Sequence, residues 1–412
     1  MNNATNFTNS AYPVAALTFA SYILRRWGYK ATFMTGLSVY GVGALLFWPA
    51  AVYRSFGGFC GATFIIGSGL GTLESAANPY LAVCGPPKYA DIRLNLAQAV
   101  QAVGTVVGPV LASQVFFKHV GENDLGSVQW VYLGISIFVF TLAVVFFFSP
   151  IPEITDADME RQAQVLAGNN VKEGKTVGQP VEERELKPIW HHWSLLWAAF
   201  SQFCYVGAQV AVASYFVNYV TEVRKGTTNA MGANFLATAQ GCFAVGRFMG
   251  AGIMKFIVPR KVLLIFFSGV ILFQAMAVGF RGNAGLAMLN MLLFFESICF
   301  PTIFTLGLKG LGRHTKRGAT FLVASIIGGA VVPPALGLAA DRFNDTGRAM
   351  VVPLAFFIFG WTFPIAVNAL PSLRAMVDDY SGRGKSDHEQ IVPDRAVGVT
   401  HEEDIEGKVT VA

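Results

Sequence analysis

A six-residue pattern occurs twice in this sequence, as ESAANP at residues 74–79 and as ESICFP at residues 296–301. Both copies read Glu-Ser-x-x-x-Pro, and both lie inside long apolar runs. Each is followed by a short basic loop and then by a glycine-rich run with internal proline, GTVVGPVLA at 104–112 and GGAVVPPALG at 328–337. Because the order of these features is the same in both copies, the sequence predicts two related halves.

A second match precedes each copy of the pattern. The stretches ILRRWGYKATFMTGL (23–37) and IMKFIVPRKVLLIFF (253–267) each join two apolar runs through a tight basic turn. Parallel repeats of this kind, placed on either side of a polar linker, are one way in which secondary transporters are built.

The amino-acid composition indicates a membrane protein. Of the 412 residues, 53% are hydrophobic and only 13% are charged, which is too few charges for an ordinary soluble surface. The net charge of +5 is small and belongs to the loops, so no nucleic-acid partner is expected. The five cysteines lie in apolar runs without the spacing of metal ligands, so neither a metal site nor another cofactor is expected.

Eleven apolar runs are long enough, or nearly so, to cross a bilayer as helices. Five precede a polar segment, at 10–24, 31–51, 56–84, 94–117 and 130–149, and six follow it, at 190–220, 229–254, 262–280, 286–308, 319–340 and 351–370. We therefore expect an all-α integral membrane protein. Its domains would be an extracellular tail (1–9), a five-helix bundle (10–149), a cytoplasmic linker (150–189), a six-helix bundle (190–372) and a disordered cytoplasmic tail (373–412).

Lysines and arginines in the loops assign the sides of the membrane. Most of them fall on the side that carries the linker and the C-terminal tail, so this side is expected to be cytoplasmic. An odd number of helices then places the N terminus outside. Two halves of six helices would give twelve, so we expect the first helix of a twelve-helix parent to be missing.

Two carboxyl groups lie within the apolar runs, Glu74 and Glu296, one in each copy of the repeated pattern. Such groups are costly in hydrocarbon and are functional candidates for that reason. Because burial disfavours the charged form of a carboxyl group, each could take up and release a proton near neutral pH. The alternative for both is a hydrogen bond that fixes helix packing.

Amide side chains form two stripes on otherwise apolar helices. The candidates for binding a substrate are Asn95, Gln98 and Gln101 in the fourth run, Gln202, Tyr205, Gln209 and Asn218 in the sixth, and Asn78 in the first Glu-Ser-x-x-x-Pro copy. Amides both donate and accept hydrogen bonds, which suits a ligand covered with hydroxyl groups, although amides also join helices in lipid. Arg247 is expected near the cytoplasmic end of its helix, as a gating latch between helix ends.

Several stretches together carry a resemblance, among them residues 69–87, 93–104, 246–257 and 300–312. With them, the chain resembles the fucose:proton symporter family of the major facilitator superfamily from about residue 26 to 341, and it looks most like a fungal member. The resemblance implies twelve helices in two pseudo-symmetric bundles, with alternating access to a central sugar site.

The same resemblance places Glu74 on the family's proton-coupling glutamate and Gln98 on a glutamine of the sugar site. Gln101 stands where a bacterial fucose-transporting member has asparagine, a departure that bears on whether fucose is the substrate. The family's acidic residue on the first helix has no counterpart here.

These residues and the resemblance predict a proton-coupled carrier of a monosaccharide such as fucose, galactose or glucose, acting as a monomer in the plasma membrane. Glu74 and Glu296 would serve proton coupling. The alternatives are a uniporter, a carrier of another polar solute, and a non-transporting sensor or inactive truncated product. An enzyme is not expected, because no nucleophile with a base, metal cluster or phosphate-binding loop is found.

Overall fold

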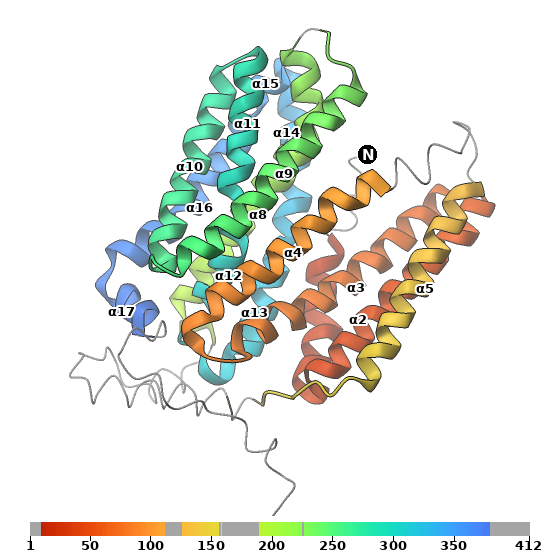
Figure 1. Cartoon of the computed structure of the whole chain (residues 1–412), viewed down its shortest axis with the longest axis vertical. Helices are drawn as coiled ribbons and strands as arrows, with labels where there is room; N and C mark the ends of the chain where they lie inside the picture. Colours follow the sequence, from red (N-terminus) through yellow and green to blue (C-terminus); the bar gives the residue numbers. More distant parts are fainter. Residues whose placement is uncertain (1–9, 112–125, 156–157, 159–188, 225, 380–412) are drawn as a thin grey trace, which may run out of the picture.

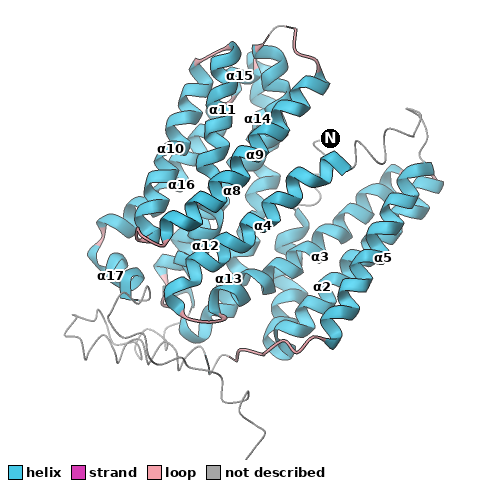
Figure 2. Ribbon diagram, in the orientation of Figure 1, coloured by secondary structure: helices cyan, strands magenta, loops and turns pink. Residues whose placement is uncertain are grey.

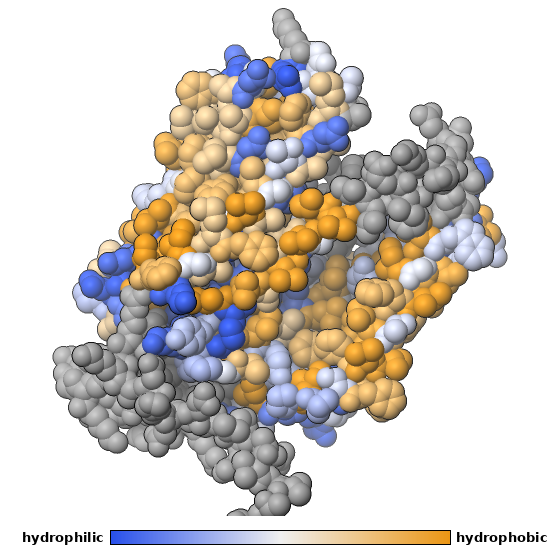
Figure 3. Space-filling view, viewed as in Figure 1, coloured by the Kyte–Doolittle hydropathy of each residue, from blue (hydrophilic) through white to orange (hydrophobic). Residues whose placement is uncertain are grey.

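The computed structural model describes residues 10–111, 126–155, 158, 189–224 and 226–379, and every regular element within these ranges is a helix (Figure 2). Eight helical stretches of this part of the chain are long and apolar enough to cross a membrane. Figure 3 shows a largely apolar surface on the flanks of the molecule, with hydrophilic residues gathered towards its ends. The expected all-α membrane fold is therefore confirmed. The predicted tail 1–9 and most of the predicted linker and C-terminal tail lie outside the described residues.

The first half begins with a helical segment at Ser10 that includes the π-helical turn η1 (Ala16–Ala20). It continues with α2 (Ser21–Val52), α3 (Phe56–Val83), α4 (Ala90–Leu111) and α5 (Gly126–Phe148). The first two predicted runs thus form one helical stretch, Ser10–Val52. This stretch bends at Gly28.

The bend at Gly28 depends on glycine. Its φ of +82° and ψ of −169° are rarely adopted by other residues. A Cβ at this position would also run into the carboxylate of Glu153, which follows α5. That carboxylate accepts hydrogen bonds from the backbone amides of Tyr29 and Lys30, each at 2.8 Å, and so caps the helix that starts after the bend. The predicted basic turn is therefore a bend at a single residue.

Among its described residues, the second half contains eight α-helices of ten residues or more and two shorter α-helices. They are α8 (Trp193–Val223), α9 (Asn229–Met254), α10 (Pro259–Gly279), α11 (Gly282–Glu296), α12 (Cys299–Leu308), α13 (Thr315–Ala324), α14 (Gly328–Phe343), α15 (Thr346–Ala349), α16 (Val351–Ala369) and α17 (Pro371–Asp379). The predicted run 286–308 is broken between α11 and α12, and the run 319–340 between α13 and α14.

Helix α17 corrects the expected boundary of the C-terminal tail. Residues 373–379 are helical rather than disordered. Arg260, at the start of α10, binds Asp378 of α17 through two contacts, Nε to Oδ1 at 2.7 Å and Nη2 to Oδ2 at 2.9 Å. The two halves share this feature. In each, a carboxylate that follows the last long helix binds near an earlier turn: Glu153 binds at the Gly28 bend, and Asp378 binds Arg260 at the start of α10.

The two halves meet at one end of the molecule, which we call the basic end. It carries the Gly28 bend and the loops 84–89 and 309–314, at the bottom of Figure 1. There α4 packs chiefly against α9 and α12 of the second half, and α13 packs against α3 and η1 of the first. Away from this end, the group formed by α2, α3 and α5 diverges from the second half (Figure 1).

Candidate functional site

Glu74 lies in α3, and its side chain is partly accessible although it is deep in the molecule. Two residues from other helices face its carboxyl group. Tyr12, in the first helical segment, forms a side-chain hydrogen bond with it, and Arg247 of α9 is close enough for electrostatic attraction. The predicted proton site of the first half therefore lies next to a cation of the second half.

Arg247 is buried, with 7% of its surface exposed. Its Nη1 donates to the backbone oxygen of Gln98 at 2.6 Å and to Oε1 of the same residue at 2.7 Å, while its Nε donates to the backbone oxygen of Ser297 at 3.0 Å. Arg247 is therefore shielded from water in this conformation, because α4 covers this part of α9. Arg247 instead joins the two halves directly.

The repeated Glu-Ser-x-x-x-Pro pattern explains why Ser297 can accept this bond. In a continuous helix, the amide of residue 301 would bind the oxygen of residue 297, but Pro301 has no amide hydrogen. The helix is interrupted here between α11 and α12. The unused oxygen of Ser297 is bound by Arg247 instead.

Gln98 links the arginine to the first half. Its Oε1 accepts from Arg247, and its Nε2 donates to Oδ1 of Asn78 at 3.3 Å. Both amides are buried, and Nδ2 of Asn78 has no hydrogen-bond partner among the described residues. A ligand with hydroxyl groups could satisfy this donor. Glu74, Asn78, Gln98 and Arg247 thus form one chain of polar groups from α3 through α4 to α9.

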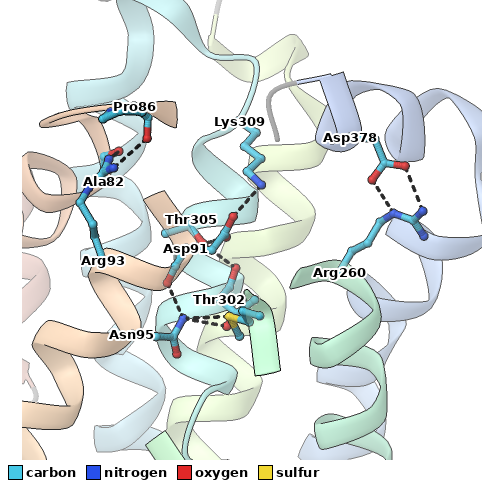
Figure 4. Close-up of polar contacts among 11 residues, drawn as sticks. Ala82, Pro86, Asp91, Arg93, Asn95, Arg260, Thr302, Thr305, Lys309 and Asp378 are labelled. Carbon is cyan, nitrogen blue, oxygen red and sulfur yellow. Dashed lines mark hydrogen bonds and ion pairs between the residues drawn. The ribbon is translucent and has the colours of Figure 1, made fainter. Parts of the chain in front are cut away.

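Asn95 lies in a different environment, at the closed basic end (Figure 4). Its Nδ2 donates to the backbone oxygen of Asp91 at 2.8 Å and to Oγ1 of Thr302 at 3.3 Å. Its side chain is fully buried against α12. In this conformation it joins α4 to the second half.

An ion pair beside Asn95 was not anticipated from the sequence. Nζ of Lys309 lies 2.8 Å from Oδ2 of Asp91, and Thr305 donates a hydrogen bond to Oδ1 of the same carboxylate (Figure 4). Both charged side chains are almost completely buried. A signal was present, since Asp91, Asn95 and Gln98 follow the spacing of one helix face. Asp91 stands between Lys88 and Arg93, just before the predicted run 94–117, so the apolar pattern does not place it on the helix.

The second-half candidates gather where α8 meets α11. The hydroxyl of Tyr205 donates to the backbone oxygen of Glu296 at 2.7 Å. Oε1 of Glu296 and both amide atoms of Gln202 are buried without hydrogen-bond partners among the described residues. Gln202 lies about one turn before Tyr205 on α8. These groups could take up a proton or a polar ligand.

The other predicted residues lie apart from these contacts. Gln101 is exposed on α4, Gln209 is half-buried on α8, and Asn218 is exposed near the end of α8. Within the described ranges, no three His, Cys, Asp or Glu side chains are grouped as for a metal ion. The site therefore brings together a carboxyl group that can bind a proton, amides that can bind hydroxyl groups, and one arginine between them.

Comparison with known proteins places this arrangement in a family. The Major Facilitator Superfamily model matches residues 6–320. The chain is 33% identical to the L-fucose-proton symporter of Escherichia coli (strain K12), over 82% of this chain and 78% of the relative. It is 32% identical to a glucose/galactose transporter of Brucella abortus, over 85% of this chain and 81% of the relative.

Solved structures agree with this placement. The structure of the transporter FucP in the outward conformation is 30% identical, covers 88% of each chain and superimposes with a TM-score of 0.75. The proton:xylose symporter XylE, at 12% identity and a TM-score of 0.67, shares the fold. On its sequence and its helix arrangement, this chain belongs to the Major Facilitator Superfamily.

Proposed function

We propose that this chain carries a monosaccharide across the plasma membrane together with a proton, as a monomer and by alternating access. The similarity to a fucose-proton symporter and to glucose/galactose transporters supports this substrate class. The proposed sugar-binding groups are the amides of Asn78, Gln98 and Gln101. Glu296, Gln202, Tyr205, Gln209 and Asn218 would complete the pathway in the second half.

The observation that carries the proposal is the position of Arg247 between Glu74 and Gln98. An ionised Glu74 attracts Arg247, which is held by Gln98 and Ser297. Proton uptake removes that attraction and makes the carboxyl group less costly to move through a low-dielectric region. The protonation state of Glu74 can thereby influence a sugar-site amide and the contact between the halves.

The closed basic end supports a proposal for the direction of access. The ion pair of Asp91 with Lys309 and the bond of Asn95 to Thr302 hold the halves together there. If the loop charges assign this end to the cytoplasm, the conformation opens outward. Sugar and proton would enter from outside, and these contacts would break when the halves rock to release them inside.

The test is uptake of labelled fucose, galactose and glucose into proteoliposomes, with and without an inward proton gradient. For Glu74→Gln we expect accumulation against the sugar gradient to vanish while exchange of sugar survives, because the amide keeps the shape but cannot titrate. Glu222→Gln is the matched control, since Glu222 accepts hydrogen bonds from Thr346 at the start of α15 and is not one of the proposed proton or sugar groups, so this change should leave accumulation unchanged.

The outcomes separate the rival functions. Accumulation that persists in Glu74→Gln would move the proton role elsewhere, with Glu296 the next residue to replace. Uptake that ignores the proton gradient in the unmodified chain would indicate a uniporter. Sugar binding without any flux would indicate a sensor or an inactive product.

A further inference from the structure

Tyr12 is a deeply buried polar residue that the proposed sugar and proton sites do not use. It lies in the first helical segment, and only 8% of its surface is exposed. Its phenol forms a side-chain hydrogen bond with the carboxyl group of Glu74. The two residues belong to different membrane-spanning segments, 62 positions apart, so helix packing brings them together.

The backbone around Tyr12 is fitted to this contact. Gly71 lies on α3, one turn before Glu74, and faces Tyr12. A Cβ on Gly71 would lie 3.1 Å from Cα of Tyr12 and 3.4 Å from its backbone oxygen. A larger residue would therefore push the first segment away from α3, and the phenol away from the carboxyl group.

We propose that Tyr12 is a positioning residue for proton exchange at Glu74. A phenol hydroxyl can donate to an ionised carboxylate and can accept from a protonated carboxyl group. Tyr12 therefore keeps Glu74 hydrogen-bonded in both protonation states and holds it in one place while the proton arrives or leaves. The inference rests on the proposed function, because it assigns a partner to the proposed proton carrier.

Among the described residues, few other charged or titratable groups face this pair. Arg247 from α9 attracts Glu74, and Tyr40 of α2 lies within electrostatic range of Tyr12. Helix α13 also packs against α3, but its Lys316 lies over the ring of Tyr29 instead. The phenol of Tyr12 and the guanidinium of Arg247 thus act on Glu74 from opposite halves of the protein.

The experiment compares Tyr12→Phe with the unmodified chain in proteoliposomes over a range of pH. The phenylalanine keeps the ring but removes the donor, so an ionised Glu74 is less stabilised. We expect the midpoint of the pH profile of proton-driven uptake to move to higher pH by about one unit. Sugar exchange should be retained. Tyr22→Phe, on the same stretch but half exposed, is the matched control and should leave the midpoint in place.

A second comparison separates this inference from the proposed function. In the background of Glu74→Gln, adding Tyr12→Phe should change sugar exchange no further, because the titrating group is already absent. An unshifted pH profile in Tyr12→Phe, with Glu74→Gln still abolishing accumulation, would overturn the role of Tyr12 alone. Accumulation that survives in Glu74→Gln would overturn the proposed function instead.

Discussion

Arg247 is the single residue whose contacts depend most on its particular side chain. Its guanidinium reaches Gln98 with one nitrogen and Ser297 with another. For Arg247→Lys we expect proton-driven uptake to fall at least about tenfold. An ammonium group keeps the charge but cannot donate to Gln98 and Ser297 from two separate nitrogens, and hydrogen bonds to charged groups contribute about 1.5–3 kcal/mol. Initial uptake rates, corrected for protein abundance, measure this. Arg25→Lys on the basic end is the control, and equal rates for both variants would contradict the bridging role.

At the scale of helices, a clamp at the end opposite the basic end joins the turn before α11 to the start of α15. The guanidinium of Arg281 donates two hydrogen bonds to the carboxylate of Asp345, from Nη1 to Oδ1 at 2.9 Å and from Nη2 to Oδ2 at 2.8 Å. Burial alone would raise the pKa of Asp345. This effect is outweighed by the hydrogen bonds and positive charge of Arg281, and by hydrogen bonds from the backbone amides of Arg348 and Gly347. The pKa is therefore held below its ordinary value of 3.8.

This clamp predicts a pH-dependent difference in stability. Since the folded-state pKa of Asp345 is lowered, its contribution is present above the ordinary value of 3.8 and is lost as pH falls through the folded-state pKa. Asp345→Asn, which keeps a helix cap, should lower the thermal unfolding midpoint at pH 7 by the equivalent of about 1 kcal/mol or less, because the pair is partly exposed. The two midpoints should converge in acid. A difference that stays constant from pH 7 to pH 3 would exclude the ion pair as its cause.

Sequence patterns predict helices better than they predict which faces meet. The repeated Glu-Ser-x-x-x-Pro pattern indicated two halves, and Glu74 could be identified because a carboxyl group is rare in an apolar run. Tyr12 gave no such signal, since a tyrosine in an apolar helix is ordinary. Asp91 stood between two cations of a loop, and its buried partner Lys309 is 218 residues away. Such contacts depend on how the halves pack, which helical periodicity does not specify.

On the scale of the whole molecule, the ion pair between Asp91 and Lys309 should set the balance between conformations. For Lys309→Ala we expect the halves to separate more often at the basic end, because an unpaired buried carboxylate costs about 3–5 kcal/mol. A cysteine placed at Thr302, in a chain whose natural cysteines are serine, should then react faster with a maleimide. Exchanging the charges, with Asp91→Lys and Lys309→Asp together, should restore slow labelling. If the parent chain, Lys309→Ala and the charge-exchanged chain are all labelled at the same rate, the ion pair does not control opening at the basic end.

The cap that Glu153 places on the Gly28 bend also bears on the order of synthesis. The two capped amides, at residues 29 and 30, leave the ribosome long before Glu153, which comes after the last helix of the first half. That cap cannot form until all of α5 has been made. Asp378 closes the second half in the same way, almost at the end of the described chain. In each half, this contact therefore forms only after nearly all of that half has been translated. A nascent chain that stops earlier lacks the carboxylate that binds at the Gly28 bend or at Arg260.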